Sequence, residues 1–406
     1  MNKFLSQIQS KKVLIFGIGI QGGGAGDTKW LTEHGAIVKV SDRNLSLCPE
    51  GQTESQIDWA EIIIKNPAVA DDHPLILRAK SQNKPVFTSI ALFVKYSPVK
   101  TIGVTGTRGK STTVALITAV LEAVYPGQII SGGNIAGTSC LSLFDQVVGK
   151  KYAVLELSSF QLHNFHDLKI SPNYAILTNI YPDHLNRYSD MESYQKDKEA
   201  IHLFQKPGDI FIKYPDPDTV REWETLLPGI HNRENIAGMW SLLSRLAIPE
   251  TTARQVVAKF TSLPFRQEII AVKKGVTYIN DTTSTTPIAA IKALQATSSS
   301  FIWITGGDSK NLPFEQLLQE VKVNPRLKGI VILGSKNIPT YTNALTNIVG
   351  DKIIGWASSI PEAVQLATKS AQEGDTILLS PAFASFDLFQ NEFDRGRQFN
   401  DYVKTL

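Results

Sequence analysis

The chain has 406 residues, of which 42% are hydrophobic and 19% are charged, and its formal net charge is +3. This length predicts two or three domains, because a single core rarely grows beyond about 250–300 residues. The net charge is too small to imply a nucleic-acid-binding surface, so we expect no nucleic-acid partner. Cys48 and Cys140 are the only cysteines, and their spacing indicates neither a disulfide framework nor a zinc site.

The sequence contains no apolar run close to the roughly 20 residues that cross a bilayer. Its first ten residues also lack the apolar core of a secretory signal. We therefore expect a cytoplasmic protein that has no membrane partner.

The first block, residues 1–97, opens with an apolar strand at 12–16, a glycine-rich turn, a helix to about residue 34 and a second strand at 36–40. Gly17, Gly19 and Gly22, followed by Asp42 about 20 positions later, have the outline of a dinucleotide-binding fingerprint. By itself this outline suggests NAD. The glycine run continues to Gly26, however, which weakens that interpretation and favours a bulky phosphate ligand close to the backbone.

The second block, residues 98–263, begins with a strand at 101–104 and then a glycine-rich loop before an apolar helix at 114–120. Gly106 and Gly109 allow the loop to turn with its N–H groups inward, Lys110 supplies positive charge, and Ser111 offers a hydroxyl to Mg²⁺. Val104 stands where the usual eight-residue pattern has its first glycine. The loop nevertheless predicts a site for a nucleotide triphosphate.

Two further strands of this block end in polar residues. The strand at 152–157 delivers Glu156, and the strand at 174–179 precedes Asp183 and His184. Because ligands of open α/β sheets bind at the carboxyl edge of the strands, we expect these side chains at the same edge as the glycine-rich loop. Helices are predicted at 194–204 and 233–246.

The third block, residues 264–406, alternates strands with helices in the manner of a second doubly wound domain. Strands are predicted at 276–280, 300–305, 329–333, 352–355 and 376–380, and helices at 287–295 and 360–373. The predicted fold class is therefore α/β with three domains. They are a Rossmann-like N-terminal domain (1–97), a central P-loop ATPase-like domain with a mostly parallel sheet (98–263), and a Rossmann-like C-terminal domain (264–406).

The order of motifs resembles the Mur ligase family over nearly the whole chain. The family's nucleotide loop, Gly-Thr-x-Gly-Lys-Ser/Thr, matches residues 106–111 and accounts for the missing first glycine. The strings at 155–162, 380–387 and 393–396 are similar to those of the members that add D-glutamate. Shorter motifs at 133–135, 183–188, 231–235 and 306–310 fall between them in the expected order.

This resemblance implies ATP-dependent peptide-bond formation, in which the carboxylate of UDP-N-acetylmuramoyl-L-alanine is phosphorylated and then attacked by the amine of glutamate. The implied partners are these two substrates, the implied cofactors are ATP and two Mg²⁺ ions, and we expect a monomer. The implied catalytic residues are Lys110, Glu156, His184 and Lys198, and the implied metal ligands are Ser111, Glu156, His184 and Lys198. In the family a lysine at the position of Lys198, four residues after a tyrosine matching Tyr194, is carbamylated by CO₂ and becomes an anionic ligand.

The resemblance also implies three binding sets. The ATP set is Gly106, Thr107, Arg108, Gly109, Lys110, Ser111, Thr112, Asn232, Asn235, Arg266 and Asp281. The UDP-substrate set is Gly17, Gly19, Gly22, Asp42, Arg43, Asn66, Asn134 and Gln161. The glutamate set is Thr285, Lys310, Ser385 and Phe386. His163 and His166 lie outside these sets and are expected to decorate the end of a helix or a turn.

One departure affects the amino-acid site. Familiar members have lysine where this chain has Thr283, so the affinity for glutamate and the preference between D- and L-glutamate stay open. A related Mur ligase or a folylpolyglutamate synthase shares the loop and the metal residues. A Rossmann oxidoreductase accounts for Gly17 to Asp42 alone, and a nucleotide-sensing regulator predicts ATP binding without phosphate release.

Overall fold

A computed structural model describes residues 2–19, 22–135, 137–184, 187–334, 338–385 and 388–406. The chain divides into two compact units. The first contains Met1–Asn179, Glu192–Asp216 and Asn235–Val256, and the second contains Ile180–Met191, Pro217–Glu234 and Val257–Leu406. Both are built from helices and largely parallel sheets, so the predicted α/β class is confirmed.

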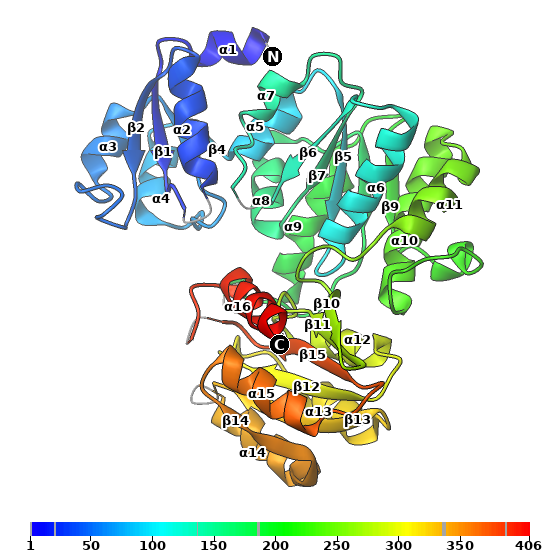
Figure 1. Cartoon of the computed structure of the whole chain (residues 1–406). Coiled ribbons are helices and arrows are strands. Elements are labelled where there is room, and N and C mark those ends of the chain that lie inside the picture. The colour runs from blue at the N-terminus through cyan, green and yellow to red at the C-terminus, as the bar shows by residue number, and fades with distance from the viewer. Residues whose placement is uncertain (1, 20–21, 136, 185–186, 335–337, 386–387) are drawn as a thin grey trace. The chain divides into compact units, whose positions relative to one another are not determined.

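The first unit starts with a parallel sheet, drawn in blue in Figure 1. Its strand order is β2-β1-β3-β4. β1 covers the predicted stretch of residues, because its four consecutive apolar side chains after Lys12 are buried. The strands are β1 (Lys12–Phe16), β2 (Ile37–Ser41), β3 (Ile62–Lys65) and β4 (Val86–Phe87). The helices are α1 (Asn2–Ile8), α2 (Gly23–Glu33), α3 (Glu54–Trp59), α4 (Pro74–Ser81) and α5 (Ser89–Tyr96).

A second parallel sheet in this unit has the order β6-β7-β5-β8-β9. Its strands are β5 (Lys100–Thr105), β6 (Ile129–Gly133), β7 (Tyr152–Glu156), β8 (Tyr174–Leu177) and β9 (Ile210–Lys213). The helices along this stretch of chain are α6 (Lys110–Val124), α7 (Leu143–Gln146), α8 (Ser159–Leu168), α9 (Met191–Leu203), α10 (Ile230–Leu243) and α11 (Glu250–Lys259). The central position of β5 places the glycine-rich loop, which follows it, between the ends of β7 and β8.

The helices of these two sheets share one hydrophobic core. Trp30 of α2 packs with Phe4 of α1, the two ring centroids being 6.0 Å apart, and its ring lies 5.8 Å from that of Phe144 of α7. Phe93 of α5 contacts the same Phe144 ring. All four rings are buried, so apolar packing joins the first sheet's helices to α7.

The second unit contains a sheet with the order β10-β11-β15-β12-β13-β14, parallel except for the β10–β11 pair. Its strands are β10 (Glu268–Lys273), β11 (Val276–Asn280), β12 (Phe301–Gly306), β13 (Leu327–Leu333), β14 (Ile353–Ala357) and β15 (Thr376–Ala382). The helices are α12 (Pro287–Ala296), α13 (Glu315–Val323), α14 (Pro339–Val349), α15 (Ile360–Ser370) and α16 (Glu392–Thr405). Among the described helices, none combines the length and the apolarity needed to cross a membrane.

Candidate active site

The glycine-rich loop joins β5 to α6 in a backbone conformation that only glycine adopts easily. Gly106 has φ 149° and Gly109, at the N-cap of α6, has φ 87°. A Cβ on Gly106 would lie 1.9 Å from Thr178 Oγ1, and one on Gly109 would lie 2.1 Å from Asn235 Oδ1. The loop is therefore packed tightly against the end of β8 and against α10.

Backbone hydrogen bonds hold the loop in this position. Thr107 N donates to Asn179 O at 2.9 Å, and Arg108 N donates to Asn179 Oδ1 at 2.8 Å. Ser111 and Thr112 follow in the first turn of α6, where the N–H groups and the helix dipole favour an anion. The structure thus brings the predicted loop residues and Asn235 together in the first unit.

Lysines from two helices converge on the loop. Lys110 Nζ donates to Gly106 O at 2.9 Å and lies 3.2 Å from Thr107 O. Lys198 of α9 is 1% exposed, and its Nζ donates to the same Gly106 oxygen at 2.9 Å. Tyr194, one turn earlier, places its hydroxyl 3.1 Å from Thr107 Oγ1. Two amino groups on one carbonyl create a site suited to a dense negative charge.

Glu156 lies buried at the carboxyl end of β7, where it pairs in register with Val104 of β5. Asn134 binds it twice: Asn134 N donates to Glu156 O at 2.8 Å, and Asn134 Nδ2 donates to Glu156 Oε1 at 3.2 Å. Within the described part of the chain, Oε2 of Glu156 accepts no hydrogen bond, so this oxygen can face a ligand. The carboxylate lies next to the strand that leads into the glycine-rich loop, as expected for the carboxyl edge.

A cavity of about 310 Å³ lies in the same unit. Its wall includes these members of the predicted UDP-substrate set: Gly17, Gly19, Asn66, Asn134 and Gln161. Gly22 is instead the left-handed N-cap of α2, and Arg43 is exposed. Asp42 is buried and accepts hydrogen bonds from Ile18 N at 2.7 Å and Asn44 N at 2.8 Å, so its carboxylate holds the glycine-rich turn.

The cavity wall also contains residues that the sequence did not single out, among them Asp27 and Ser158. Ser158 caps α8 within the string at 155–162, so that motif carried a usable signal. Asp27 gave none. Burial raises the pKa of its carboxyl, whose Oδ1 accepts hydrogen bonds from Ser139 Oγ and Leu141 N. Asp27 therefore joins α2 to the loop before α7.

Four residues of the predicted ATP and metal sets belong to the second unit. Asn232 Nδ2 donates to Pro228 O at 2.7 Å, and Asp281 accepts hydrogen bonds from Gln267 N and Ser380 Oγ. Arg266 directly precedes Gln267. His184 has φ 57°, and its Nε2 lies 3.8 Å from Asp183 Oδ2.

The predicted glutamate residues also lie in the second unit. Lys310 Nζ donates to Thr285 Oγ1 at 3.0 Å, and both residues line a small recess together with Phe383. Ser385 is buried and lines a separate recess with Phe389. Phe386 lies outside the described residues.

Arg395 of α16 holds the backbone between these recesses. It is fully buried, and it donates hydrogen bonds to Thr282 Oγ1 and to the carbonyls of Thr282, Phe383 and Ala384. Burial lowers the pKa of its guanidinium to about 10, which leaves it charged at neutral pH.

We expect Arg395→Leu to destabilise the protein by about 3 kcal/mol, because three buried carbonyls lose their donor. Chemical denaturation followed by fluorescence measures this loss. Arg397→Leu on the exposed side of the same helix is the control and should change stability by less than about 0.5 kcal/mol. Equal effects of the two substitutions would contradict the assigned role of Arg395.

Thr283, which stands where familiar members have lysine, makes a local structural contact. Its Oγ1 donates to Phe265 O at 2.9 Å, and Phe265 has a left-handed φ of 65°. The hydroxyl thus fastens the turn that enters β10, and it brings no positive charge to the neighbouring residues.

The sequence is similar to families and to individual proteins that are already known. Residues 104–238 match the Mur ligase middle domain, and residues 265–383 match the Mur ligase, glutamate ligase domain. The chain is 33% identical over 404 residues to UDP-N-acetylmuramoylalanine--D-glutamate ligase of Christiangramia forsetii, with 88% of each protein covered. It is 29% identical over 468 residues to the protein of the same name from Roseiflexus sp., with 98% of this chain and 100% of the relative covered.

Solved structures show the same fold at low sequence identity. UDP-N-acetylmuramate-alanine ligase of Thermotoga maritima has a TM-score of 0.63 and 18% identity, covering 97% of this chain and 99% of its own. The MurF ligase of the same organism, solved with ADP, has a TM-score of 0.61 and 17% identity, with 99% and 97% covered.

Proposed function

The chain belongs to the Mur ligase family, and we propose that it joins D-glutamate to UDP-N-acetylmuramoyl-L-alanine at the expense of ATP, a step of peptidoglycan precursor synthesis. One observation carries the proposal furthest. Asn134 is part of the cavity wall and also binds Glu156, which lies beside the strand that leads into the phosphate loop. A substrate in the cavity and a nucleotide at the loop are therefore linked through one residue pair.

The proposed reaction has two steps. A carboxylate oxygen of the UDP substrate attacks the γ-phosphorus of ATP, the bond to the bridging oxygen breaks, and ADP leaves. The amine of glutamate then attacks the acyl carbon, the bond to the phosphate oxygen breaks, and phosphate and a proton leave. Both steps bring anions together, so positioning and charge neutralisation supply most of the catalysis.

In this proposal Lys110 and the N–H groups of the loop hold the phosphates of ATP. Asn232, Asn235, Arg266 and Asp281 complete the nucleotide site, Arg266 offering a planar fork to phosphate and Asp281 accepting from a ribose. Gly17, Gly19, Asn66, Asn134 and Gln161 bind the UDP substrate. Thr285, Lys310 and Ser385 bind glutamate.

The residues present fit Mg²⁺ bound together with a nucleotide. The described residues contain no cluster of three or more His, Cys, Asp or Glu side chains that could hold a metal on its own. Mg²⁺ in nucleotide sites needs only one or two protein oxygens, because phosphates and water complete its shell. The Ser111 hydroxyl and Oε2 of Glu156 are oxygens of this kind, and we propose His184 and a carbamylated Lys198 as further ligands. Mg²⁺, when bound, neutralises phosphate charge.

We also propose that the chain has three functional domains, at 1–97, 98–263 and 264–406. The first is Rossmann-like and binds the UDP substrate, the second is P-loop-like and binds ATP, and the third is Rossmann-like and binds glutamate. The separate sheets within these ranges support this division. We propose that the protein acts as a monomer in the cytoplasm.

A phosphate-release assay tests the function. The protein is incubated with ATP, Mg²⁺ and UDP-N-acetylmuramoyl-L-alanine, separately with D-glutamate, L-glutamate or meso-diaminopimelate. Release that depends on D-glutamate is expected. Release with L-glutamate instead would assign an altered amino-acid pocket, consistent with the missing lysine at Thr283. ATP binding without release under any condition would favour a regulator.

A further inference from the structure

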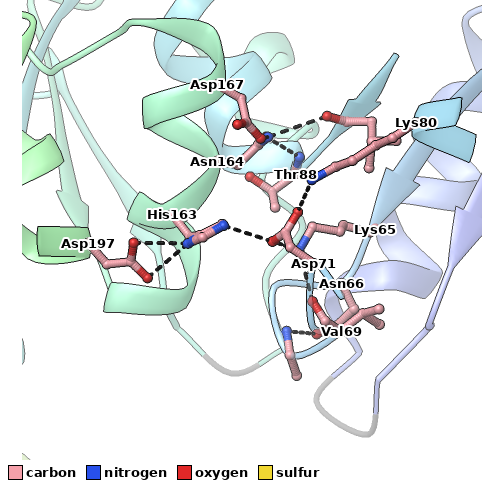
Figure 2. Close-up of polar contacts among 12 residues, drawn as sticks. Lys65, Asn66, Val69, Asp71, Lys80, Thr88, His163, Asn164, Asp167 and Asp197 are labelled. Atoms are coloured by element: carbon pink, nitrogen blue, oxygen red, sulfur yellow. Dashed lines mark hydrogen bonds and ion pairs between the residues drawn. The ribbon is translucent and has the colours of Figure 1, made fainter. Parts of the chain in front are cut away.

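His163 lies in the middle of α8 with a carboxylate at each ring nitrogen (Figure 2). Its Nδ1 is 2.9 Å from Asp197 Oδ1 and 3.0 Å from Asp197 Oδ2, and its Nε2 is 3.1 Å from Asp71 Oδ2. The sequence-based expectation that His163 decorates a helix end is therefore wrong. His166, in contrast, does lie in the last turn of α8.

Asp71 belongs to the loop after β3, which also lines the cavity proposed to bind the UDP substrate. Lys65 Nζ donates to it at 2.9 Å and Lys80 Nζ at 2.8 Å, while Lys65 also donates to Val69 O. The same loop supplies Asn66, Pro67 and Ala68 to the wall of the 310 Å³ cavity. The position of Asp71 is thus tied to the shape of that wall.

Asp197 belongs to α9, the helix that contacts the glycine-rich loop proposed to bind ATP. It is buried and directly precedes Lys198, whose Nζ contacts the phosphate loop. Successive residues of a helix point about 100° apart, so Asp197 can face α8 while Lys198 faces the loop. Tyr194 of the same helix reaches Thr107. Fixing Asp197 therefore fixes the helix that carries both loop contacts.

The protonation state of His163 decides how many carboxylates it holds. A neutral imidazole has one N–H donor, whereas the imidazolium has two and can donate to Asp71 and Asp197 together. The pKa of His163 is raised above its ordinary 6.5, chiefly by the hydrogen bond to Asp197 and also by the negative charges of Asp197 and Asp71. Burial and the positive charge of Lys65 lower this pKa, but they do not outweigh the rise. Lys80 faces the same cluster through Asp71.

Because the folded-state pKa is raised, the double contact stabilises the fold fully below about pH 6.5. It is lost as the pH rises through the folded-state value. A neutral link beside it does not titrate: Asn164 Oδ1 accepts from Thr88 N at 2.8 Å, and Asn164 Nδ2 donates to Val86 O (Figure 2). Variants of His163 should therefore still fold.

We propose that His163 is a positioning residue that fastens the loop at 65–71 to α9, so that the wall of the substrate cavity and the Lys198 contact with the phosphate loop keep a fixed relation. The inference rests on the proposed function for its catalytic consequence. Its structural part, the bridge between Asp71 and Asp197, stands independently of that function.

The catalytic consequence is tested with His163→Gln in the ligase assay between pH 6.5 and 9. Near pH 6.5 we expect kcat/KM for the UDP substrate to fall about ten-fold, the loss that follows from one charge-assisted hydrogen bond. As the pH rises, kcat/KM of the wild-type protein should approach that of the variant, so the ratio of the two values should approach one. A merely structural role predicts a ratio that does not depend on pH.

His166→Gln is the matched control. His166 lies on the same helix and its Nε2 contacts the Lys196 carbonyl of α9 at 3.0 Å, but its ring is not bound to Asp71. It should keep the wild-type pH profile. Equal losses in the two variants, or a pH-independent ratio for His163→Gln, would overturn the catalytic part.

A double-mutant cycle tests the bridge without any activity. Asp71→Asn, His163→Gln and the double variant are unfolded by heat at pH 6.5, and their Tm shifts are compared. We expect the double variant to lose less than the sum of the single losses. Additive shifts would overturn the bridge. Coupled shifts in a protein that shows no ligase activity would retain the bridge and remove the proposed function.

Discussion

Replacing Lys110 with alanine is expected to lower kcat about a thousand-fold, the loss typical of removing one preorganised donor from developing charge. Lys110 opens α6 and its Nζ lies against the carbonyls of Gly106 and Thr107, where the phosphates of ATP are proposed to bind. Steady-state phosphate release with saturating substrates measures the change. The KM for ATP should rise as well, because the ammonium also binds the ground state.

Binding of the UDP substrate separates this effect from misfolding. Lys110 is not part of the cavity wall, so calorimetry with UDP-N-acetylmuramoyl-L-alanine should give nearly the wild-type Kd. Lys100→Ala, on an exposed position at the start of β5, is the control and should keep full activity. A Lys110→Ala protein that retains a tenth of the wild-type kcat would refute the role assigned to this lysine.

Ten of the described strands and the glycine-rich loop were predictable because their signals are local. A continuous apolar run marks β15, and the run before Gly106 marks β5, since strands buried on both faces carry no polar alternation. No strand was predicted at the positions of β3, β4, β6, β9 and β10. In β10 two apolar residues, Ile269 and Val272, are exposed on an edge strand, so burial did not shape its sequence.

Contacts within the candidate site were less predictable because they depend on side chains that are distant in sequence. Asp42 was read as part of a cofactor fingerprint, and it directly follows β2 as expected, but its carboxylate accepts a hydrogen bond from Ile18 N inside the turn. The distance between Lys198 and Gly106 follows from the packing of α9 against the sheet. The bridge through His163 requires two carboxylates that lie 92 and 34 residues away, and no periodic pattern signals such a pair.

Lys198→Ala is expected to lower kcat about a hundred-fold to a thousand-fold, provided that the lysine acts as a carbamate. In that form the ammonium of Lys198 has lost one proton, its Nζ has bonded to the carbon of CO₂, and a second proton has been released. The carbamate would offer an anionic oxygen to Mg²⁺. The 1% exposure of Lys198 and the 2.9 Å distance from its Nζ to Gly106 O suit such a role, because a carbamate at this position would be buried beside the glycine-rich loop.

Chemical rescue distinguishes a carbamate from an ammonium in the same assay. A short carboxylic acid such as acetate can occupy the space left by alanine and return an anionic oxygen, so it should restore at least a tenth of the lost activity. A short alkylamine should not. Lys196→Ala, on the exposed side of α9, is the control and should respond to neither. Rescue by the amine alone would assign Lys198 the role of a cation beside Lys110, and wild-type activity in Lys198→Ala would remove it from the site.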